Sequence, residues 1–464
     1  MKTITILLLF TTSFASACTA FFIKTKNDNV FVFKNYDWHQ EPAYILTNPK
    51  NVIKKSFPTG QKDAVWTSKY SSLTVNQYGK EFPIEGVNEM GLLVQTLILP
   101  EANYTFSEEK SCVNELQFIQ YQLDNFSTVD EVLENLPQIS IVPITANVHY
   151  FIVDKSGDAA VIDFVNGKLQ MSRKSIADNM VLANSPYQQS ISYWKKEERL
   201  FAQRHSLNRF CAVQNQLTTL SQNQDFNIEK GFSFLETSQV ASTQWSTAYD
   251  LQHQKLYFKT KSQNTVKTLD WSLLDFSKTF YFPLISNEKN EVSTFFTILT
   301  KEKNYDLLKK SMNEIYVYQV ENDLNALNNY QIEPNSLVKT IDFKKNTGTL
   351  HVRIEGLRNN SGTLRIAYAN SEERYVKKDF NNAIVILPNE NQAEWTLYNL
   401  PFGDYVFGLH HDKNGDDKFN NFLGIPTESF GFSNNAKGFL GFPKYRKAVI
   451  KFETNKQVIN IKCK

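Results

Sequence analysis

Short apolar runs separated by polar turns follow residue 17 of the chain. The stretch from Cys18 reads CTAFFIKTKNDNVFVFKNYDWH, in which the polar turn 26–29 lies between one apolar run and a second run, Val30 to Phe33. Two strand-like runs joined by a turn of this kind are typical of a β-hairpin. The pattern therefore predicts a hairpin that begins at Cys18.

Further strands and helices alternate after this hairpin. Three segments have the short apolar character of strands: residues 91–99, 149–154 and 159–164. Three others favour helices, two of them through apolar residues at mixed three- and four-residue steps: 113–126, 129–136 and 190–203. Ser127 and Thr128 supply a cap for the second helix. Two sheets with helices outside them are the layered arrangement that this alternation favours.

A polar region at about 287–346 separates this part of the chain from a series of short strands. We interpret it as a connecting region with a helix around 305–316. From residue 347, short alternating segments return between Gly- and Asn-rich turns: 349–354, 363–367, 383–387, 395–397, 405–410 and 448–452. This pattern predicts a small β-sandwich at 347–464.

Length and composition support a globular protein of several domains. A chain of 464 residues is longer than one hydrophobic core normally serves, so we expect two or three domains. Fifty Lys and Arg residues against 48 Asp and Glu give a formal charge of +2, which does not favour nucleic acid or an anionic membrane as partner. The 35 Phe and 21 Tyr residues favour strand-rich layers.

The first 17 residues have the three parts of a secretory signal peptide. Lys2 precedes an apolar stretch that runs to Phe10, and Ala15 and Ala17 are small enough for the subsites of a signal peptidase. The predicted cut leaves Cys18 at the start of the mature chain. No later stretch has the apolar length of a membrane helix, so we expect a soluble protein in the periplasm or outside the cell.

Cys18 admits three interpretations. It could form a disulfide with Cys112, Cys211 or Cys463, although four cysteines spread over so long a chain do not make a stapled scaffold. It could be acylated as in a bacterial lipoprotein, but such signals normally carry Leu at the position of Ala15. It could also be an N-terminal nucleophile, which needs a free thiol and a free amine and therefore cannot be lipidated.

An α-amine is a suitable base for a thiol on the same residue. It titrates near ~7.7 to 8.0, against ~10.4 for lysine, so a useful fraction is neutral at working pH. It can accept the thiol proton directly or through one water, and no separate histidine is needed. The seven histidines accordingly form no HExxH or other ligand-spaced pattern, and the pair His410 and His411 fits a strand end.

The region from Cys18 to about Phe276 resembles the choloylglycine hydrolase family. This family comprises linear-amide hydrolases with an N-terminal cysteine and includes conjugated bile salt hydrolases and penicillin V acylases. The resemblance rests on motifs in family order: CTAFF, KNYDW, EGVNEMGLLVQTLILP, HYFIVDKSGDAAVID, LANSP, SLNRF and TQWSTAYDL. It implies an α+β fold, the αββα sandwich of N-terminal nucleophile hydrolases, over residues 18–286.

The resemblance also implies roles for single residues. Cys18 matches the nucleophile that forms an acyl-thioester, and Asp37 matches the aspartate that hydrogen-bonds its amine. Asn184 in LANSP matches the side-chain donor to the oxyanion, and Arg209 in SLNRF matches the arginine that favours thiolate. Each also has a plain structural interpretation: turn residues for Asp37 and Asn184, and a surface position on a helix for Arg209.

Two positions depart from the family pattern. Lys34 stands where the family usually has arginine, so the charge is kept but the planar fork is lost. Ile98 stands where bile salt hydrolases carry asparagine and penicillin acylases tyrosine, so only its backbone N–H could complete an oxyanion hole. Apolar side chains near these motifs either line an acyl pocket or pack in the core: Phe21, Phe22, Trp38 and Leu97.

The C-terminal segment resembles a bacterial domain of unknown function, through HDKNGDDKF and GIPTESFGFSNN. Asp412, Asn414 and Asp416 alternate as oxygen donors do in calcium loops, and Gly415 permits a sharp turn. The glutamate that closes an EF-hand loop and the flanking helices are absent. We therefore favour a bare surface turn over a calcium site, and an adhesion or positioning module over a second active site.

Two functions of different classes follow from these observations. The first is a secreted, cofactor-free amidohydrolase that cleaves a small-molecule acyl amide, such as a conjugated bile salt, penicillin V or an N-acyl homoserine lactone. The second is an inactive envelope lipoprotein anchored through Cys18 that uses the same fold for binding. The resemblance also allows a homo-oligomer, since the family commonly forms tetramers.

Overall fold

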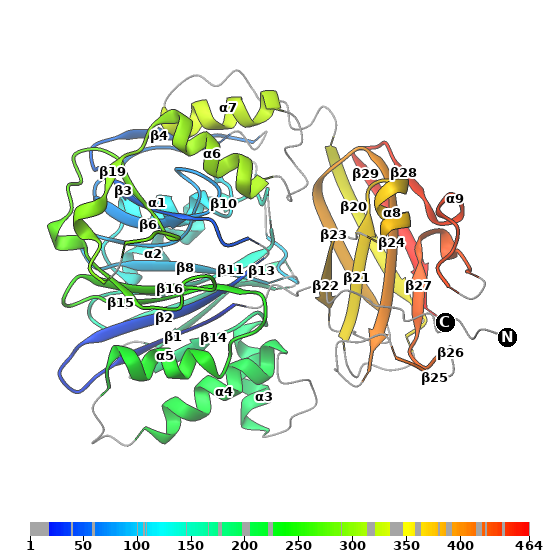
Figure 1. Ribbon diagram of the computed structural model, residues 1–464, viewed down its shortest axis with the longest axis horizontal. Helices are drawn as coiled ribbons and strands as arrows, with labels where there is room; N and C mark the ends of the chain where they lie inside the picture. Colours follow the sequence, from blue (N-terminus) through cyan, green and yellow to red (C-terminus); the bar gives the residue numbers. More distant parts are fainter. Residues whose placement is uncertain are drawn as a thin grey trace. The chain divides into compact units, whose positions relative to one another are not determined.

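The computed structural model divides into two compact units (Figure 1). The first contains Ala17–Glu198 and Ser206–Lys345, and the second contains Asn346–Lys464. The predicted signal segment, residues 1–17, lies outside the described residues. The structure describes residues 18–463 except for 39, 58–60, 100, 105–106, 108, 145, 166, 175–178, 197–204, 221–225, 289, 313–320, 335–346, 358–362, 379–380, 387–391, 414–419, 423–424 and 439–440.

One layer of the first unit is an antiparallel six-stranded sheet in the order β14-β1-β2-β15-β16-β17. Its strands are β1 (Thr19–Lys24), β2 (Val30–Asp37), β14 (Asn179–Leu182), β15 (Thr243–Asp250), β16 (Lys255–Thr260) and β17 (Lys267–Asp270). The predicted hairpin is confirmed, since β1 and β2 pair with Lys24 opposite Val30. Asp28 in its turn has φ of 59°, a left-handed conformation that Asp and Asn tolerate better than most residues.

The second layer is an antiparallel nine-stranded sheet in the order β13-β12-β11-β8-β7-β6-β3-β18-β19. Its strands are β3 (Tyr44–Asn48), β6 (Ser72–Asn76), β7 (Pro83–Asn88), β8 (Leu93–Ile98), β11 (Val148–Val153), β12 (Ala159–Val165), β13 (Lys168–Lys174), β18 (Phe280–Pro283) and β19 (Thr297–Ile298). The three predicted strands are confirmed as β8, β11 and β12. Smaller elements complete this unit: β4 (Ile53–Lys55) with β5 (Val65–Thr67), β9 (Ser111–Val113) with β10 (Ile139–Ile141), and the 3-10 turns η1 (Leu136–Gln138), η2 (Trp271–Leu273) and η3 (Ser293–Phe295).

Helices cover the outer faces of the two sheets, which gives the predicted αββα sandwich (Figure 1). The nine-stranded sheet carries α1 (Gln117–Asn125) and α2 (Val129–Asn135). The six-stranded sheet carries α4 (Ser206–Thr219) and α5 (Ile228–Glu236), and α3 (Tyr187–Lys195) packs against α4.

The ends of these helices differ from the predicted ones where side chains compete for backbone groups. The predicted helix 113–126 begins only at Gln117, because Asn114 Oδ1 accepts the N–H groups of Leu116 and Gln117 and so caps the first turn. Thr128 caps α2 as expected, with Oγ1 accepting the Glu131 N–H at 3.2 Å. The predicted helix 190–203 begins earlier, at Tyr187, and is assigned through Lys195, and residues 197–203 of the prediction lie outside the described residues.

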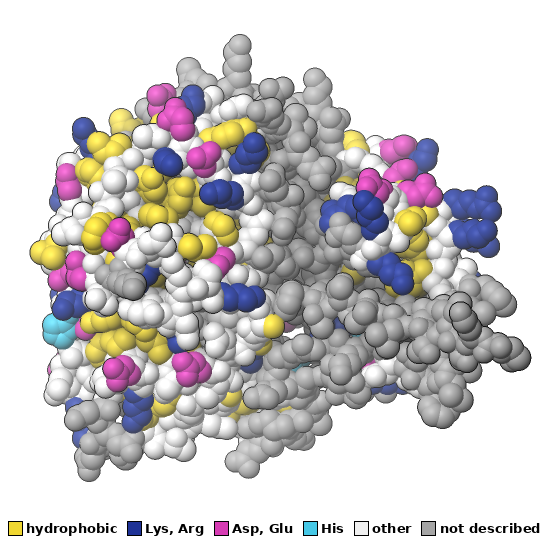
Figure 2. Space-filling model, in the orientation of Figure 1, with side chains coloured by type: hydrophobic (Ala, Val, Ile, Leu, Met, Phe, Trp, Pro, Cys, Tyr) yellow, Lys and Arg dark blue, Asp and Glu magenta, His cyan; other side chains and the backbone are white. Residues whose placement is uncertain are grey.

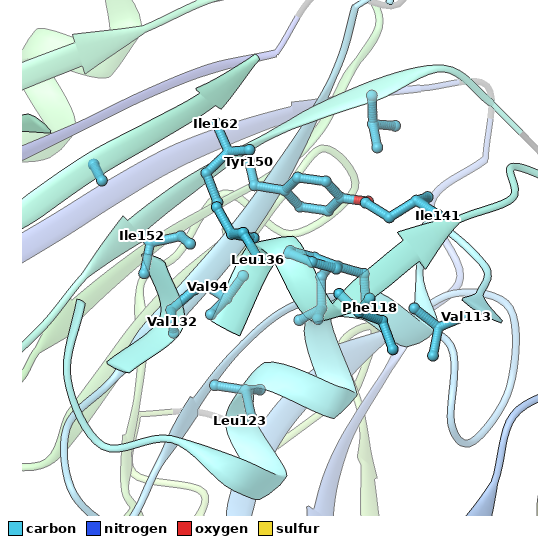
Figure 3. Close-up of a cluster of buried hydrophobic side chains, with 14 of the residues drawn as sticks. Val94, Val113, Phe118, Leu123, Val132, Leu136, Ile141, Tyr150, Ile152 and Ile162 are labelled. Atoms are coloured by element: carbon cyan, nitrogen blue, oxygen red, sulfur yellow. The ribbon is translucent and has the colours of Figure 1, made fainter. Parts of the chain in front are cut away.

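A large apolar core of the first unit lies between the nine-stranded sheet and α1 and α2 (Figure 3). Val94, Tyr150, Ile152 and Ile162 face it from β8, β11 and β12, and Phe118 faces it from α1. The Phe118 and Tyr150 rings lie 4.3 Å apart. Because strand residues alternate between faces, the residues between these positions point toward the six-stranded sheet. We call the region between the two sheets the inter-sheet layer.

Two further helices, α6 (Lys301–Met312) and α7 (Glu321–Ile332), belong to the first unit although they lie in the polar region 287–346. Tyr330 Oη donates to the Lys55 carbonyl and accepts from Gln117, both at 2.5 Å. Gln331 Nε2 donates to the Tyr78 carbonyl at 2.7 Å. Gly79 has φ of +79°, and a Cβ there would lie 2.1 Å from Gln331 Oε1, so only glycine permits this approach. The helix expected around 305–316 is present as α6 through Met312, and residues 313–316 lie outside the described residues.

The second unit is β-rich, as predicted, with two sheets that face each other. Trp395 of the three-stranded sheet β23-β20-β29 lies 6.2 Å from Tyr368 and 6.1 Å from Phe407 of the other sheet, β22-β21-β24-β27, measured between ring centroids. The elements are β20 (Thr347–Glu355), β21 (Thr363–Ala369), α8 (Glu372–Lys377), β22 (Asn381–Ile386), β23 (Ala393–Pro401), β24 (Gly403–Asp412), β25 (Asn421–Phe422), β26 (Ile425–Pro426), β27 (Phe430–Phe432), η4 (Ser433–Asn435), α9 (Tyr445–Ala448), β28 (Ile450–Phe452) and β29 (Lys456–Lys462).

The surface of the first unit carries charges of both signs. On the face shown in Figure 2, Lys and Arg side chains are interspersed with Asp and Glu, in keeping with the balanced formal charge. None of the helices in the described part of the chain combines the length and the apolar character needed to cross a membrane.

Candidate active site

Cys18 lies immediately before β1 and is almost completely buried, at 1% exposure. Phe22 lies four residues after Cys18 and therefore on the same face of the strand. Its ring contacts that of Phe151 of β11 with centroids 6.3 Å apart, so this face of β1 points into the inter-sheet layer. The Cys18 thiol is directed toward the Asp37 carbonyl, with Sγ and O 4.0 Å apart. The pairing of Ala20 with Leu182 brings the residues that follow β14 alongside Cys18.

Asp37 ends β2 as a fully buried carboxylate beside Cys18. Its Oδ1 accepts a hydrogen bond from Thr243 Oγ1 at the start of β15, whereas Oδ2 has no hydrogen-bond partner among the described residues. Burial raises the pKa of Asp37 to about 7, against the opposing effects of Arg209, the Thr243 hydrogen bond and Lys34. The open oxygen can accept a hydrogen bond from an amine.

Arg209 projects from α4 and ties three parts of the site together. Its Nη1 donates to the Cys18 carbonyl at 2.6 Å and to Thr19 Oγ1 at 2.5 Å. Its Nη2 donates to Asn184 Oδ1 at 2.9 Å. Only 2% of the residue is exposed, and burial lowers the pKa of Arg209 against the opposing charges of Asp37 and Cys18. The guanidinium therefore lies inside the site and not on a helix surface.

The contact with Arg209 fixes the orientation of the Asn184 amide. Because Oδ1 faces the guanidinium, Nδ2 points the other way and donates to the Ile98 carbonyl at 2.7 Å. An amide nitrogen carries two hydrogens, so this bond leaves one of them for a further acceptor.

The backbone of Ile98, at the end of β8, faces the Asn184 amide. Its partner across the sheet is Val148, whose N–H and C=O both bond to Tyr104 Oη at 2.8 Å on the opposite side. Ile98 and Val148 are therefore a non-hydrogen-bonded pair, and the N–H and C=O of Ile98 point away from β11. The side chain of Ile98 packs against the apolar core.

Lys34 and Glu85 form a buried ion pair across the inter-sheet layer. Lys34 Nζ lies 3.2 Å from Glu85 Oε2 and donates to the Ile84 carbonyl at 3.2 Å. Glu85 also accepts from Thr247 Oγ1 at 2.9 Å and from Gln95 Nε2 at 3.1 Å. Neither member of the pair is more than 1% exposed. The Glu85 carboxylate has partners on both sheets, since Lys34 and Thr247 belong to the six-stranded sheet and Gln95 to the nine-stranded sheet.

The buried surroundings of the Cys18 thiol disfavour its ionisation to a thiolate. Burial raises its pKa to about 11, and the Asp37 charge adds to this, whereas Lys34, the hydrogen bond to the Asp37 backbone and Arg209 lower it. A neutral thiol in this position needs a base at short range before it can attack a carbonyl.

The structure brings together all six residues singled out by the motifs: Cys18, Lys34, Asp37, Ile98, Asn184 and Arg209. Two contacts were not anticipated. Thr243 begins the motif TQWSTAYDL and Glu85 begins EGVNEMGLLVQTLILP, and a charged residue at the head of an apolar run was the available signal for the second. Of the proposed pocket residues, Phe21 packs in the core and stacks on Phe33 at 4.7 Å.

The calcium candidate in the second unit is described only in part. Asp412 is buried at the end of β24 and its Oδ2 pairs with Arg365 Nε at 3.2 Å, so its charge already has a partner. Asn414 and Asp416 lie outside the described residues. Among the residues that the structure describes, no group of three or more His, Cys, Asp or Glu side chains could hold a metal ion.

Family comparisons agree with both parts of the chain. Residues 18–223 match the family described as linear amide C-N hydrolases, choloylglycine hydrolase family. Residues 352–460 match a family described as an uncharacterized protein conserved in bacteria, DUF2141.

Two individual proteins are similar to part of the chain. The chain is 25% identical to the penicillin V acylase of Pectobacterium atrosepticum over 312 residues, which cover 56% of this chain and 82% of that protein. It is 30% identical to the bile salt hydrolase/transferase of Clostridium perfringens over 186 residues, which cover 36% and 54%.

Solved structures share the fold. The penicillin V acylase of Agrobacterium tumefaciens superposes with a TM-score of 0.54 at 21% identity, covering 61% of this chain and 98% of the other. A mutant of the conjugated bile acid hydrolase of Clostridium perfringens gives 0.50 at 20% identity, covering 59% and 98%. At these identities the likeness concerns the fold alone.

Proposed function

We propose, from the premise that this chain carries a linear amide C-N hydrolase domain of the choloylglycine hydrolase family, that Cys18 becomes its N-terminal nucleophile. The substrate is an N-acyl amine whose acyl group is transferred to the Cys18 thiol. A conjugated bile salt, penicillin V and an N-acyl homoserine lactone are the candidate classes. Removal of residues 1–17 as a signal peptide during secretion is the step that exposes the α-amine.

A single observation carries this proposal: the Cys18 thiol, an open carboxylate oxygen of Asp37 and the Asn184 donor all meet at the start of β1. A buried carboxylate oxygen without a partner is costly, and an amine on Cys18 supplies the missing hydrogen bond. The same bond keeps the amine at the thiol. Because Cys18 is held through its carbonyl by Arg209, its nitrogen and sulfur are both available for chemistry.

The reaction then proceeds through a thioester. The α-amine takes the thiol proton, and the sulfur forms a bond to the amide carbonyl carbon while the carbonyl oxygen becomes negative. Asn184 Nδ2 and the Ile98 N–H are the donors for that oxyanion. The C–N bond breaks as the ammonium returns the proton to the leaving nitrogen, which departs as a free amine. Water activated by the α-amine then hydrolyses the thioester and releases the acid.

Replacement of the nucleophile tests the proposal. We expect Cys18→Ala to reduce hydrolysis of a panel of penicillin V, glycine- and taurine-conjugated bile salts and N-acyl homoserine lactones to background, a loss of at least about 10³-fold in kcat. Cys211→Ala, which removes another buried cysteine, is the matched control and should retain activity. Hydrolysis that persists in Cys18→Ala rejects the assigned nucleophile.

Mass spectrometry of the mature protein tests the starting point of the mechanism. A chain that begins at Cys18 without added mass is expected. A diacylglyceryl group on the Cys18 sulfur or an acyl group on its amine contradicts the proposal, because the first blocks the nucleophile and the second blocks the base, and either supports a lipoprotein that binds without hydrolysis.

A further inference from the structure

The turn that carries Asn184 joins β14 to α3 and is anchored at both ends. Its amide is held by Arg209 and by the Ile98 carbonyl, as described above. Three residues later, α3 begins at Tyr187, and the residue at its N-cap is Pro186, which provides no side-chain cap. The first N–H groups of a helix need acceptors from elsewhere in the protein.

Asp163 supplies that acceptor from the other sheet. Its Oδ2 accepts the Tyr187 N–H at 2.8 Å, although Asp163 lies on β12 of the nine-stranded sheet. A carboxylate at this position also interacts favourably with the helix dipole of α3. Asp163 thus caps α3 across the inter-sheet layer and ties the turn to the nine-stranded sheet.

His149 holds the other oxygen of the same carboxylate. Its Nδ1 lies 2.7 Å from Asp163 Oδ1, and neither side chain is more than 2% exposed. His149 pairs with Leu97 across β11 and β8, so it lies one residue from Ile98 along the sheet. A buried carboxylate that bonds at both oxygens has little freedom to rotate.

We propose that Asp163, oriented by His149, is a positioning residue that places the Asn184 amide for the oxyanion. The turn 184–187 is attached to the nine-stranded sheet at two points, Asn184 to the Ile98 carbonyl and Tyr187 to Asp163. Loss of the second attachment lets the turn shift against Ile98, so the two oxyanion donors no longer lie side by side. The inference rests on the proposed function, because it assigns Asn184 its role.

The molecule contains a matched control for this arrangement. Asp154 is also buried next to the nine-stranded sheet, and its Oδ2 accepts the N–H of Val129, the first residue of α2, at 3.0 Å. α2 packs on the outer face of that sheet, away from the inter-sheet layer. Asp154→Ala therefore removes a buried carboxylate acceptor from the start of a helix, one that Thr128 also caps, without touching the turn that carries Asn184.

The test compares these variants with the panel substrate that the wild-type protein cleaves fastest. We expect Asp163→Ala to lower kcat by about 10- to 100-fold, with KM changed less than about threefold, because small displacements of a reacting group cost this much. Asp163→Asn keeps an acceptor for the Tyr187 N–H and should recover most of kcat. Asp154→Ala should lower stability toward urea to a similar degree while kcat stays within about twofold of the wild type.

A double-mutant cycle separates positioning from general destabilisation. In an Asn184→Ala background, Asp163→Ala should cause little further loss of kcat, because the donor that it positions is already absent. Losses of kcat that multiply overturn the inference, as does a kcat for Asp163→Ala within twofold of Asp154→Ala.

A second variant serves if Asp163→Ala does not fold. The pair Asp163→Leu with His149→Phe replaces both buried polar groups by apolar ones of similar size, and it still leaves the Tyr187 N–H without its acceptor. It should show the same loss of kcat, and a wild-type kcat in this pair also overturns the inference. Cys18→Ala measured in parallel keeps the two questions apart: hydrolysis by that variant contradicts the proposed function, whereas multiplying losses contradict only the role of Asp163.

Discussion

The two faces of the nine-stranded sheet are built from the same strands but differ in their polar side chains, because only the inter-sheet face combines apolar residues such as Phe151 with buried charged and polar groups. Toward α1 and α2, the strands present Val94, Tyr150, Ile152 and other apolar side chains that form one core (Figure 3). Toward the six-stranded sheet, neighbouring positions on the same strands present polar groups: Glu85, Gln95, His149 and Asp163. A shift of one residue in register would exchange the two sets.

The comparison shows where stability and chemistry are located. The apolar face buries hydrocarbon and leaves few polar atoms to satisfy. The inter-sheet layer is buried just as deeply, yet Asp37 Oδ2, Gln95 Oε1 and His149 Nε2 have no hydrogen-bond partner among the described residues. Such groups cost stability, and one of them, Asp37 Oδ2, belongs to the residue whose carbonyl accepts from the Cys18 thiol, where an amine on Cys18 would supply the missing donor.

The largest expected effect tests the apolar face. Phe118→Ala removes a fully buried ring that contacts Tyr150 and should lower the free energy of unfolding by about 3–5 kcal/mol. kcat per folded molecule should remain within about twofold of the wild type, because the ring lies on the opposite side of the sheet from Cys18. Urea unfolding and active-site titration measure the two quantities. A tenfold loss of kcat in the folded fraction would mean that the two faces are not independent.

The next effect tests the polar face. Asn184→Ala should lower kcat by roughly 10²–10³-fold, which corresponds to about 2.7–4 kcal/mol of transition-state stabilisation, with a much smaller change in KM. The amide is aimed by Arg209, and alanine leaves neither a donor nor an acceptor in its place. Steady-state kinetics measure the split. If KM rises while kcat is unchanged, Asn184 binds substrate in the ground state and is no oxyanion donor.

The smallest effect concerns the ion pair between the sheets. Lys34 lowers the pKa values of both the Cys18 thiol and Asp37, so Lys34→Met should raise them and move the rising limb of kcat/KM to higher pH. A displacement of up to about one pH unit corresponds to ~1.4 kcal/mol. Lys34→Arg keeps the charge and should leave the limb close to its wild-type position. An unmoved limb in Lys34→Met removes Lys34 from the electrostatics of the site.

Sequence motifs were sufficient to name the residues that meet at Cys18, but not the pairs that they form. Short apolar runs placed β8, β11 and β12 correctly, because these strands are buried on both faces, between the helices and the six-stranded sheet. The ion pair of Lys34 with Glu85 joins residues on different sheets, and no local pattern specifies which strands will lie opposite each other. The same limit applies to Asp163 and Tyr187, whose contact depends on how the two sheets stack.

The polar region before the second unit shows a different limit. α7 buries Asn328 and Gln331, and α6 buries Asn304, so these helices have no continuous apolar stripe for periodicity to detect. Their polar side chains bond to one another and to the backbone of the first unit: Asn304 Oδ1 accepts the Lys80 N–H at 2.8 Å, and Asn304 Nδ2 donates to Asn328 at 2.9 Å. Composition alone therefore made a packed region resemble a linker.

The packing of α7 also determines where the chain can be divided for separate expression. A fragment cut at residue 286 would lose the Tyr330 hydroxyl that donates to the Lys55 carbonyl of β4 and the Gln331 amide that donates to the Tyr78 carbonyl. A fragment that extends through Pro334 keeps these hydrogen bonds, and it also keeps the Pro334 carbonyl that accepts the Lys55 N–H at 3.1 Å. α6 and α7 are thus part of the packed structure of the first unit, and a fragment for separate expression should end after them.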